Sequence, residues 1–355
     1  MSLLASPLQA LDPFKTQFRS VEPAQILHDS SRPSMPGKER LKLLTWNLKF
    51  GGARIDFFID GHGDRVLMTS EEVLTNLDAI AEAINSIDPD VLFVQEIDRF
   101  SRRVAGIDQF ELLFEKTRFR YAAFSSQWRS TYIPSRGIGP VNMGNGIFAK
   151  YPLKDVQRLS LPPISEQDEL TRYFYLKRNI MVGTMEVPGF EELTLVNCHA
   201  AAFAQDNTKE KHLGLLFSEL KRINRSGRMF VLGADLNAVP PDTKILRDFE
   251  DVASLPGAQR AAFYEGEAHL LEPFYECFYE AISHQDYKLD QCRHFTHSTR
   301  GTVFWNRKLD YLFSNRPFVK HSAVTYQDEN QGGLPTMGLS DHAPLGAEMN
   351  LEKKK

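Results

Sequence analysis

The sequence predicts a mixed α/β sandwich, and two observations support that fold class. Segments typical of strands outnumber segments typical of helices, and both kinds are scattered along the whole chain. Residues 41–96 also contain a strand, a helix and a second strand in succession. No proline- or glycine-rich linker divides the 355 residues, so we expect one large domain at 41–350 after an N-terminal arm at 1–40.

The first elements are predicted from periodicity and end signals. Residues 1–40 combine several prolines with little periodicity, which is typical of a surface arm. The apolar segments LKLLTWNL, at 41–48, and DVLFVQE, at 90–96, predict buried strands. Between them, an apolar stripe runs along residues 69–88. A threonine and a glutamate three positions apart form a capping box at its start, so we predict a helix there.

The remaining elements continue the same alternation. A second helix is predicted from Asn207, because Glu210 follows three residues later and apolar residues then recur at helical spacing. Further strands are predicted at 145–150, 179–187, 193–200, 228–234, 308–314 and 342–349.

Composition and charge narrow the class of protein. The chain is 42% hydrophobic and 25% charged, as a soluble globular protein is, and its net charge of −4 argues against dominant non-specific duplex binding. Three scattered cysteines are too few for a disulfide framework. No apolar run reaches the roughly 20 residues that span a bilayer, and the N-terminus lacks a basic signal region. We expect a monomeric, cytoplasmic protein with no membrane insertion; a leader already removed would be invisible here.

Polar residues of one chemical kind stand where the predicted strands end. Within a strand, residues two positions apart point the same way, so Asp235 and Asn237 should project together. One such residue usually forms a turn, but five apolar strands share the feature, and sites in α/β folds assemble where strand ends converge. The residues are Asn47, Glu96, His199, Asp235 with Asn237, and Asp341 with His342.

These side chains predict metal-assisted hydrolysis of a phosphate ester. Glu96, Asp341 and Asn47 offer the hard oxygen ligands that Mg²⁺ or Mn²⁺ prefers. The two histidines can donate to phosphoryl oxygens or move protons near neutral pH. Asp235 can orient or deprotonate a water, which Asn237 can hold in line. No glycine-rich phosphate loop and no G-x-S-x-G motif points to another chemistry.

The ordered motifs TWN, QE, GADLN, LDYLF and SDH resemble those of the endonuclease/exonuclease/phosphatase superfamily, over residues of about 41–350. The resemblance implies a four-layer sandwich, two central mixed β-sheets flanked by helices, as a single domain. It also implies that Glu96 is the main metal ligand, assisted by Asn47 and Asp341. One departure is Ala234, which replaces the acid or amide that precedes the catalytic aspartate in some branches.

The resemblance further implies roles for the remaining candidates. Asp235 is similar to the residue that activates or orients water, and Asn237 to its transition-state partner. His342 resembles the phosphate-contacting imidazole, with Asp310 of KLDYLF behind it. His199 resembles the second histidine of the deoxyribonuclease and sphingomyelinase branches, often assigned as general acid. Substrate phosphate contacts are implied for two further residues, Arg178 in LKRNIMV and Asn145 in MGNGIFAK, the latter with a turn role as the alternative.

The resulting hypothesis is a Mg²⁺-dependent phosphodiesterase. The alternatives are a DNA-repair endonuclease or exonuclease, and an inactive binding module on the same fold. An acidic segment at 261–290 would repel a long polyanion if it lined the rim, whereas residues 99–136 are basic and aromatic enough to stack bases. Nucleic acid is thus a possible partner that is not favoured. A zinc site in QCRHFTH is disfavoured, because Cys292, His294 and His297 fit no common spacing.

Overall fold

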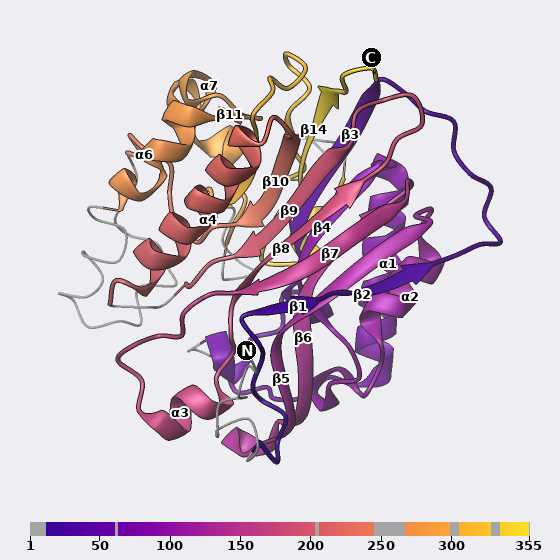
Figure 1. The fold of residues 1–355 in the computed structure, drawn as a ribbon. Coiled ribbons are helices and arrows are strands. Elements are labelled where there is room, and N and C mark those ends of the chain that lie inside the picture. Colours follow the sequence, from indigo (N-terminus) through magenta and orange to yellow (C-terminus); the bar gives the residue numbers. More distant parts are fainter. Residues whose placement is uncertain are drawn as a thin grey trace, which may run out of the picture.

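The computed structural model describes residues 12–60, 63–202, 206–244, 267–298, 305–327 and 334–354. Within them the chain forms two seven-stranded sheets that pack face to face (Figure 1). The first sheet has the order β1 (Val21–Pro23), β7 (Leu153–Ser160), β8 (Asn179–Met185), β9 (Leu193–His199), β10 (Met229–Asp235), β12 (Asp310–Ser314) and β11 (Tyr279–Glu280). The second has the order β13 (Val324–Thr325), β14 (Leu345–Asn350), β3 (Arg40–Asn47), β4 (Val91–Asp98), β6 (Gly139–Ala149), β5 (Tyr121–Ile133) and β2 (Gln25–His28).

Helices cover the outer faces of both sheets. Figure 1 shows α1 and α2 outside the second sheet, and α4 and α6 outside the first. The helices are α1 (Ser70–Ile87), α2 (Gln109–Lys116), α3 (Glu169–Phe174), α4 (Thr208–Arg225), α6 (Ala268–Cys277) and α7 (His284–Leu289). In each sheet one inner pair of strands is parallel, β9 with β10 and β3 with β4, while their neighbours are antiparallel. The predicted four-layer sandwich with two mixed sheets is therefore confirmed.

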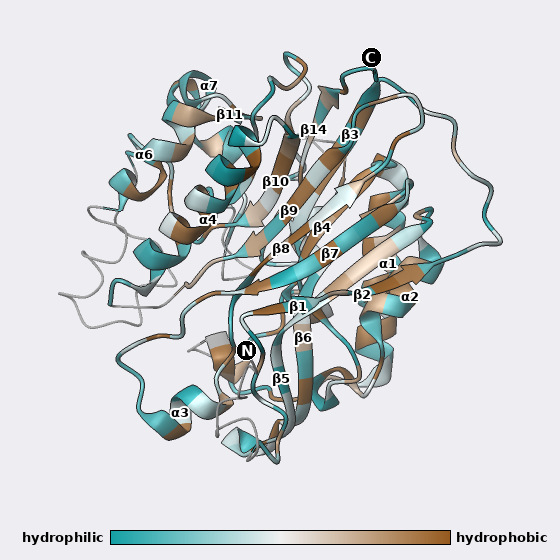
Figure 2. Cartoon of the chain, in the orientation of Figure 1, coloured by the Kyte–Doolittle hydropathy of each residue, from teal (hydrophilic) through white to brown (hydrophobic). Residues whose placement is uncertain are grey.

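The hydrophobic core lies in three layers that follow this arrangement. One cluster fills the space between the sheets, and the others lie between each sheet and its helices. Figure 2 shows hydrophobic residues concentrated along the strands. The sheets approach closely at Gly233, where an added Cβ atom would lie 2.3 Å from Cδ2 of Phe93 on the facing sheet. Gly233 is two residues from the end of β10, so this contact sets the spacing of the sheets near the strand ends.

The helix starts test the capping predictions. Thr69 and Glu72 form the predicted capping box of α1. The predicted cap of α4 is wrong, because the Asn207 side chain makes no capping hydrogen bond. Instead, Asp206 Oδ1 accepts a hydrogen bond from the backbone N–H of Thr208 at 2.9 Å, so the carboxylate one residue earlier satisfies the helix start.

The segment predicted as an arm contributes to both sheets. β1 pairs with β7 at the edge of one sheet, and β2 pairs with β5 at the edge of the other, with only Ala24 between them. Such short, half-exposed strands carry too little periodicity to be recognised in the sequence. In the described part of the chain, no helix has the length and apolar character needed to cross a membrane.

Candidate active site

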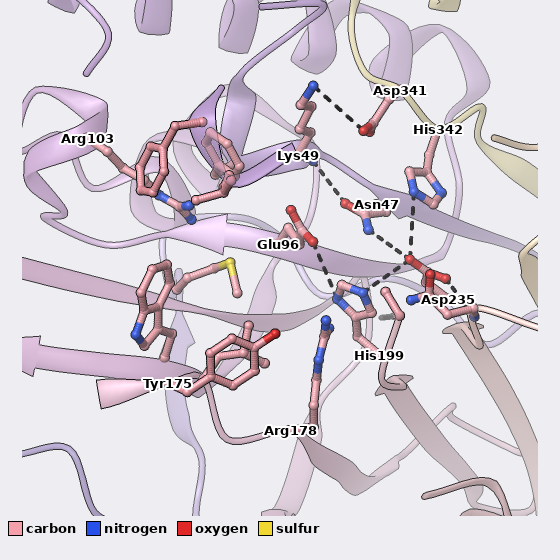
Figure 3. Close-up of a pocket in the computed structure, with 18 of the residues that line it drawn as sticks. Asn47, Lys49, Glu96, Arg103, Tyr175, Arg178, His199, Asp235, Asp341 and His342 are labelled. Atoms are coloured by element: carbon pink, nitrogen blue, oxygen red, sulfur yellow. Dashed lines mark hydrogen bonds and ion pairs between the residues drawn. The ribbon is translucent and has the colours of Figure 1, made fainter. Parts of the chain in front are cut away.

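Strand register places the predicted residues at one end of the sandwich. Asp235, the last residue of β10, lies beside His199 of parallel β9 and opposite Asp310 of antiparallel β12. On the facing sheet, β3 ends at Asn47, which lies beside Gln95 of β4. The predicted convergence of strand ends is thus present, because side chains from the ends of both parallel pairs, Asn47, His199 and Asp235, line one cavity (Figure 3).

Asp235 is the central side chain of this cluster. Its Oδ2 accepts a hydrogen bond from Asn47 Nδ2 at 2.9 Å, and its Oδ1 accepts one from the backbone N–H of Asn237 at 3.0 Å. His199 Nε2 and His342 Nε2 lie 3.3 and 3.7 Å from Oδ2 (Figure 3). Burial raises the pKa of Asp235, which the charge of His342 partly offsets. The result is a buried carboxylate of increased basicity.

Asn237 adopts a left-handed conformation immediately after β10. Its φ of 49° is a conformation that asparagine tolerates better than most residues. In this turn the backbone N–H of Asn237 donates a hydrogen bond to Asp235, and its side-chain Nδ2 donates one to the carbonyl of Ala200 at 3.2 Å. The strand therefore ends before Asn237, and a turn rather than strand alternation brings the two side chains into one cavity.

His342 is paired with the carboxylate predicted to lie behind it. Its Nδ1 lies 2.8 Å from Asp310 Oδ2. Burial opposes the protonated form, but the charges of Asp310 and Asp235 outweigh burial and raise the pKa of His342 to about 10. His342 is consequently a cation at neutral pH, with Nε2 directed toward Asp235.

His199 is buried in a different electrostatic environment. Among the described residues its Nδ1 has no hydrogen-bond partner, and the carboxylate paired with that atom, Glu96 Oε1, is 3.8 Å away. Burial, with Arg178 as the second cause, holds the pKa of His199 well below its usual range. His199 is consequently neutral in the free protein.

Glu96 enters the cavity through an irregularity in β4. The pairing of β4 with β6 shifts register between Val94 and Ile97, and Glu96 has a φ of 53°. Such a bulge redirects a side chain at the cost of local ladder pairing. Burial is the main cause that raises the pKa of Glu96, and the charge of Asp341 raises it further. The two carboxylates therefore interact unfavourably without a cation between them.

Glu96, Asn47 and Asp341 line the same cavity and carry the oxygen donors that hard divalent cations prefer. Asp341 Oδ2 lies 3.8 Å from Lys49 Nζ. Asn47 Oδ1 accepts a hydrogen bond from the backbone N–H of Lys49 at 2.9 Å. Two groups of side chains are also close enough together to hold a metal ion; they are Asp235, Asp310 and His342, and His297, Asp341 and His342. Hard oxygen donors and imidazole at one site are compatible with Mg²⁺ or Mn²⁺.

A cavity of about 410 Å³ joins these groups. Arg178 lines it, and Arg178 Nη1 is buried without a hydrogen-bond partner among the described residues. Asn145 does not line the cavity. It is buried in β6, two residues from the lining residue Met143, and both atoms of its amide lack a partner among the described residues.

Several lining residues were not identified from the sequence. His297 packs its ring against His342, with ring centres 4.4 Å apart. Lys49, Arg103 and Tyr175 also line the cavity. In the sequence, His297 was considered only as part of a zinc motif in QCRHFTH. In the structure, an isolated β-bridge between His297 and His342 brings His297 to the site. No local signal in the sequence indicates that bridge.

Known proteins share both the sequence pattern and the fold of this chain. The sequence model of the endonuclease/exonuclease/phosphatase family matches residues 44–342. The fold is similar to that of an endonuclease/exonuclease/phosphatase from Beutenbergia cavernae DSM 12333, with a TM-score of 0.59 and 15% identity over 89% of this chain and 72% of that chain. It is also similar to a family protein from Leptotrichia buccalis C-1013-b, with a TM-score of 0.52 and 16% identity over 88% and 99% of the two chains.

A third similar structure is the human Nocturnin catalytic domain with bound sulfate anion. Its TM-score is 0.50, and the two chains are 16% identical over 92% of this chain and 97% of that one. No sequence among proteins with curated descriptions matches this chain. At these identities the structural comparisons establish the fold, which the family match supports independently.

Proposed function

This chain belongs to the endonuclease/exonuclease/phosphatase family, and from the arrangement of its cavity we propose that it is a Mg²⁺- or Mn²⁺-dependent phosphodiesterase. One observation carries the proposal. Asp235 is held by Asn47 and the Asn237 backbone beside the cationic His342, in the same cavity as the Glu96 carboxylate. A base, a cation for phosphoryl oxygens and metal-binding oxygens are thereby combined, as metal-assisted hydrolysis requires.

The metal ligands that we propose are Glu96, Asn47 and Asp341. Their oxygens fit a hard divalent cation, and the unfavourable effect of Asp341 on ionisation of Glu96 would be relieved by one. A bound cation would supply charge neutralisation of the phosphate and of the departing oxygen. Lys49 would remain beside Asp341 as a further positive charge.

We assign activation of the attacking water to Asp235. Burial raises the pKa of Asp235, and a carboxylate of higher pKa is a better proton acceptor at neutral pH. Asn47 and the backbone of Asn237 fix the carboxylate orientation. We propose that the Asn237 side chain, which lines the same cavity, holds the water in line. Hydrolysis then proceeds with attack on the side of the phosphorus that faces Asp235.

The remaining side chains are assigned to the phosphate and to the attacking water. His342, kept protonated by Asp310, would stabilise charge on the phosphoryl oxygens. Arg178 would contact the same oxygens through its unpartnered nitrogen. The phosphate contact expected of Asn145 stays a prediction from the sequence, because Asn145 does not line the cavity. His199 is expected from the sequence to be the general acid, but its Nε2 lies 3.3 Å from Asp235 Oδ2, on the attacking side. We therefore propose that His199 helps to orient the attacking water.

A diester suits the cavity better than a monoester. Three carboxylates, Glu96, Asp235 and Asp341, line it. A monoester dianion would bring two negative charges to them, whereas a diester brings one, and repulsion at short range is strong in a partly buried site. The predicted monomeric state and cytoplasmic location stay predictions from the sequence.

Hydrolysis of bis(p-nitrophenyl) phosphate tests the proposal. We expect turnover with Mg²⁺ or Mn²⁺ and none after EDTA treatment, with recovery when the metal is restored. Glu96→Gln should weaken Mg²⁺ binding in calorimetry and lower turnover by about 10²-fold or more. Glu82→Gln, at an exposed position of α1, is the matched control and should change neither quantity. Unaltered Mg²⁺ affinity in Glu96→Gln would remove Glu96 from the ligand set.

The two alternatives make different predictions for the same protein. An inactive binding module would show no metal-dependent hydrolysis of any diester. A repair nuclease would cleave duplex DNA with a much higher kcat/KM than it shows for small diesters. Neither alternative is favoured by the described cavity, whose volume of about 410 Å³ is in the range of small-molecule sites.

A further inference from the structure

One half of the cavity is apolar and takes no part in the chemistry proposed above. Its side chains come from residues that are far apart in the sequence. Arg103 joins two of them, because its guanidinium lies over the rings of Phe50 and Trp128. We call this the apolar half, and it is formed chiefly by Phe50, Phe58, Ile59, Trp128, Met143 and Tyr175. It is continuous with the catalytic cluster, because all of these residues line the same space as Asp235 and His342.

The walls of the apolar half are fixed by contacts behind them. Trp128 Nε1 donates a hydrogen bond to the carbonyl of Phe174 at 2.7 Å. The Arg103 guanidinium stacks on Phe50, 3.7 Å from the ring centre, and binds Asp98 through two hydrogen bonds of 2.7 and 2.8 Å. Arg103 is only 1% exposed. Its charge is therefore balanced by Asp98, and it supports an aromatic wall instead of offering a free cation.

The apolar half lies on the side of the site where a leaving group would depart. In Figure 3, Arg103 and Tyr175 lie across Glu96 from Asp235 and His342. An in-line displacement places the attacking and leaving oxygens on opposite sides of the phosphorus. If Asp235 activates the water, the leaving group moves away from Asp235, past Glu96 and toward the apolar half.

We infer that the apolar half binds the leaving group of the substrate and that this group carries an aromatic ring. The inference rests on the proposed function, because it uses the direction of attack from Asp235. Aromatic walls favour a planar ring through offset or edge-to-face packing. The cavity volume of about 410 Å³ is in the range of small-molecule sites and accommodates a small diester. A phenol and a nucleobase share the chemistry that the walls recognise.

Calorimetry with non-hydrolysable phosphonates tests the inference in the presence of Mg²⁺. Phenylphosphonate and methylphosphonate have the same anionic group and differ only in the ring. We expect phenylphosphonate to bind about tenfold tighter or more, the scale expected for burying one ring. 5′-AMP is the third probe: tighter binding than phenylphosphonate supports a nucleobase ring, and weaker binding supports a phenol. Equal affinities for all three probes would overturn the inference.

Two variants test whether the apolar half causes the preference for phenylphosphonate over methylphosphonate. Tyr175→Ala removes one wall of the apolar half and should reduce the phenyl-to-methyl affinity ratio to within about threefold. Tyr132→Ala is the matched control, because Tyr132 is 49% exposed, packs against Phe14 and does not line the cavity; the ratio should keep its wild-type value. Should Tyr175→Ala fail to fold, Ile59→Ala, at a position 38% exposed, tests the same wall. An unchanged ratio in the folded variant would contradict the assignment.

The inference and the proposed function can fail separately. Metal-dependent hydrolysis of bis(p-nitrophenyl) phosphate without any preference for phenylphosphonate would remove the apolar half as a leaving-group site and leave the proposed function standing. Preference for phenylphosphonate without hydrolysis of any diester would remove the proposed function and retain an aromatic-binding cavity.

Discussion

His199 and His342 are both buried beside Asp235, yet their pKa values move in opposite directions. His342 has a second carboxylate on its far nitrogen, Asp310 at 2.8 Å, whereas Nδ1 of His199 has no hydrogen-bond partner among the described residues. Burial disfavours the charged imidazole in both cases, and only the paired ring overcomes that cost. The site therefore holds one cationic and one neutral histidine around one base.

Asp310→Asn tests this pairing. Burial lowers the pKa of His342, but the charges of Asp310 and Asp235 outweigh it and raise that pKa to about 10, so His342 keeps its proton below that pH and loses it as the pH rises through it. The amide removes the charge, so the alkaline limb of the pH–rate profile should move to lower pH. Turnover at neutral pH should fall by roughly 10²-fold.

The controls for Asp310→Asn separate orientation from general damage. Mg²⁺ affinity measured by calorimetry should be retained, because Asp310 is not among the proposed ligands. Asp155→Asn, at an exposed position of β7, makes the same chemical change elsewhere and should leave the profile unmoved. Wild-type turnover and an unmoved alkaline limb in Asp310→Asn would show that the pair has no catalytic role.

At the residue scale, the sequence indicates which side chains gather but not how they contact one another. The order of motifs was sufficient to pair His342 with Asp310. The hydrogen bond from Asn47 to Asp235 joins strands of different sheets, and no local pattern encodes it. His297 was missed for the same reason, since a bridge to His342 across a long sequence separation places it.

At the element scale, the site depends on how closely β10 and β4 approach. Gly233 of β10 faces Phe93 of β4 and leaves no room for a Cβ atom. Asp235 follows Gly233 by two residues in β10, and Glu96 follows Phe93 by three residues in β4. The spacing of the two sheets at Gly233 therefore also sets the separation of Asp235 from Glu96.

Gly233→Ala should destabilise the protein. The added methyl group would lie 2.3 Å from a buried aromatic ring that is enclosed by the core, so the sheets must separate or Phe93 must shift. We expect a loss of about 1–3 kcal/mol in the free energy of unfolding, measured by denaturant titration. Gly214→Ala in α4 is the matched control. A Cβ atom added there would have no atom within 4 Å, so the substitution should stabilise the helix by about 0.5–1 kcal/mol.

One result for the two glycine variants would contradict the prediction for Gly233. If both substitutions change the free energy of unfolding by the same amount and sign, close packing at Gly233 does not constrain the sheets. Refolding yields and far-ultraviolet circular dichroism would confirm that each variant reaches a folded state before its stability is compared.

Elements with long, strong periodicity could be predicted, and those with weak or mixed patterns could not. The α1 helix and the apolar strands β3, β4, β9 and β10 match their predicted segments closely. The strand predicted at 145–150 is only the end of β6, and β5 was not predicted. Polar residues interrupt the alternation of β5, and its pairing with β6 shifts register between Ser126 and Trp128 and between Ser130 and Ile133.

At the scale of the whole molecule, the net charge and the pairing of basic side chains disfavour binding of a long polyanion. The net charge is −4, and two arginines of the basic segment 99–136 are already paired: Arg99 binds Asp108, and Arg103 binds Asp98. Phe119 and Phe124 of the same segment are buried in the core, so they are unable to stack on bases. In the described part of the acidic segment, residues 267–290, no residue lines the cavity, so the repelling rim considered from the sequence is not supported.

Duplex DNA should accordingly bind weakly and with little dependence on salt. Each phosphate neutralised contributes about −0.9 to the slope of log K against log salt concentration. Because the paired arginines are not available to phosphates, we expect a slope shallower than about −2 in a fluorescence anisotropy titration. A slope of several units at physiological salt would favour the repair nuclease. Calorimetry with phenylphosphonate, which carries a single anionic group, over the same salt concentrations provides the reference for a local electrostatic contact.

The two short strands near the N-terminus have a consequence for solubility. β1 pairs along one edge of the first sheet and β2 along one edge of the second, so the segment Val21–His28 covers one edge of each sheet. Loss of this segment would leave β7 and β5 with rows of unpaired backbone N–H and C=O groups, which are templates for pairing with another chain. We therefore expect a shortened chain to self-associate through its sheets even with every side chain of the candidate site in place, because Val21–His28 protects the fold against aggregation.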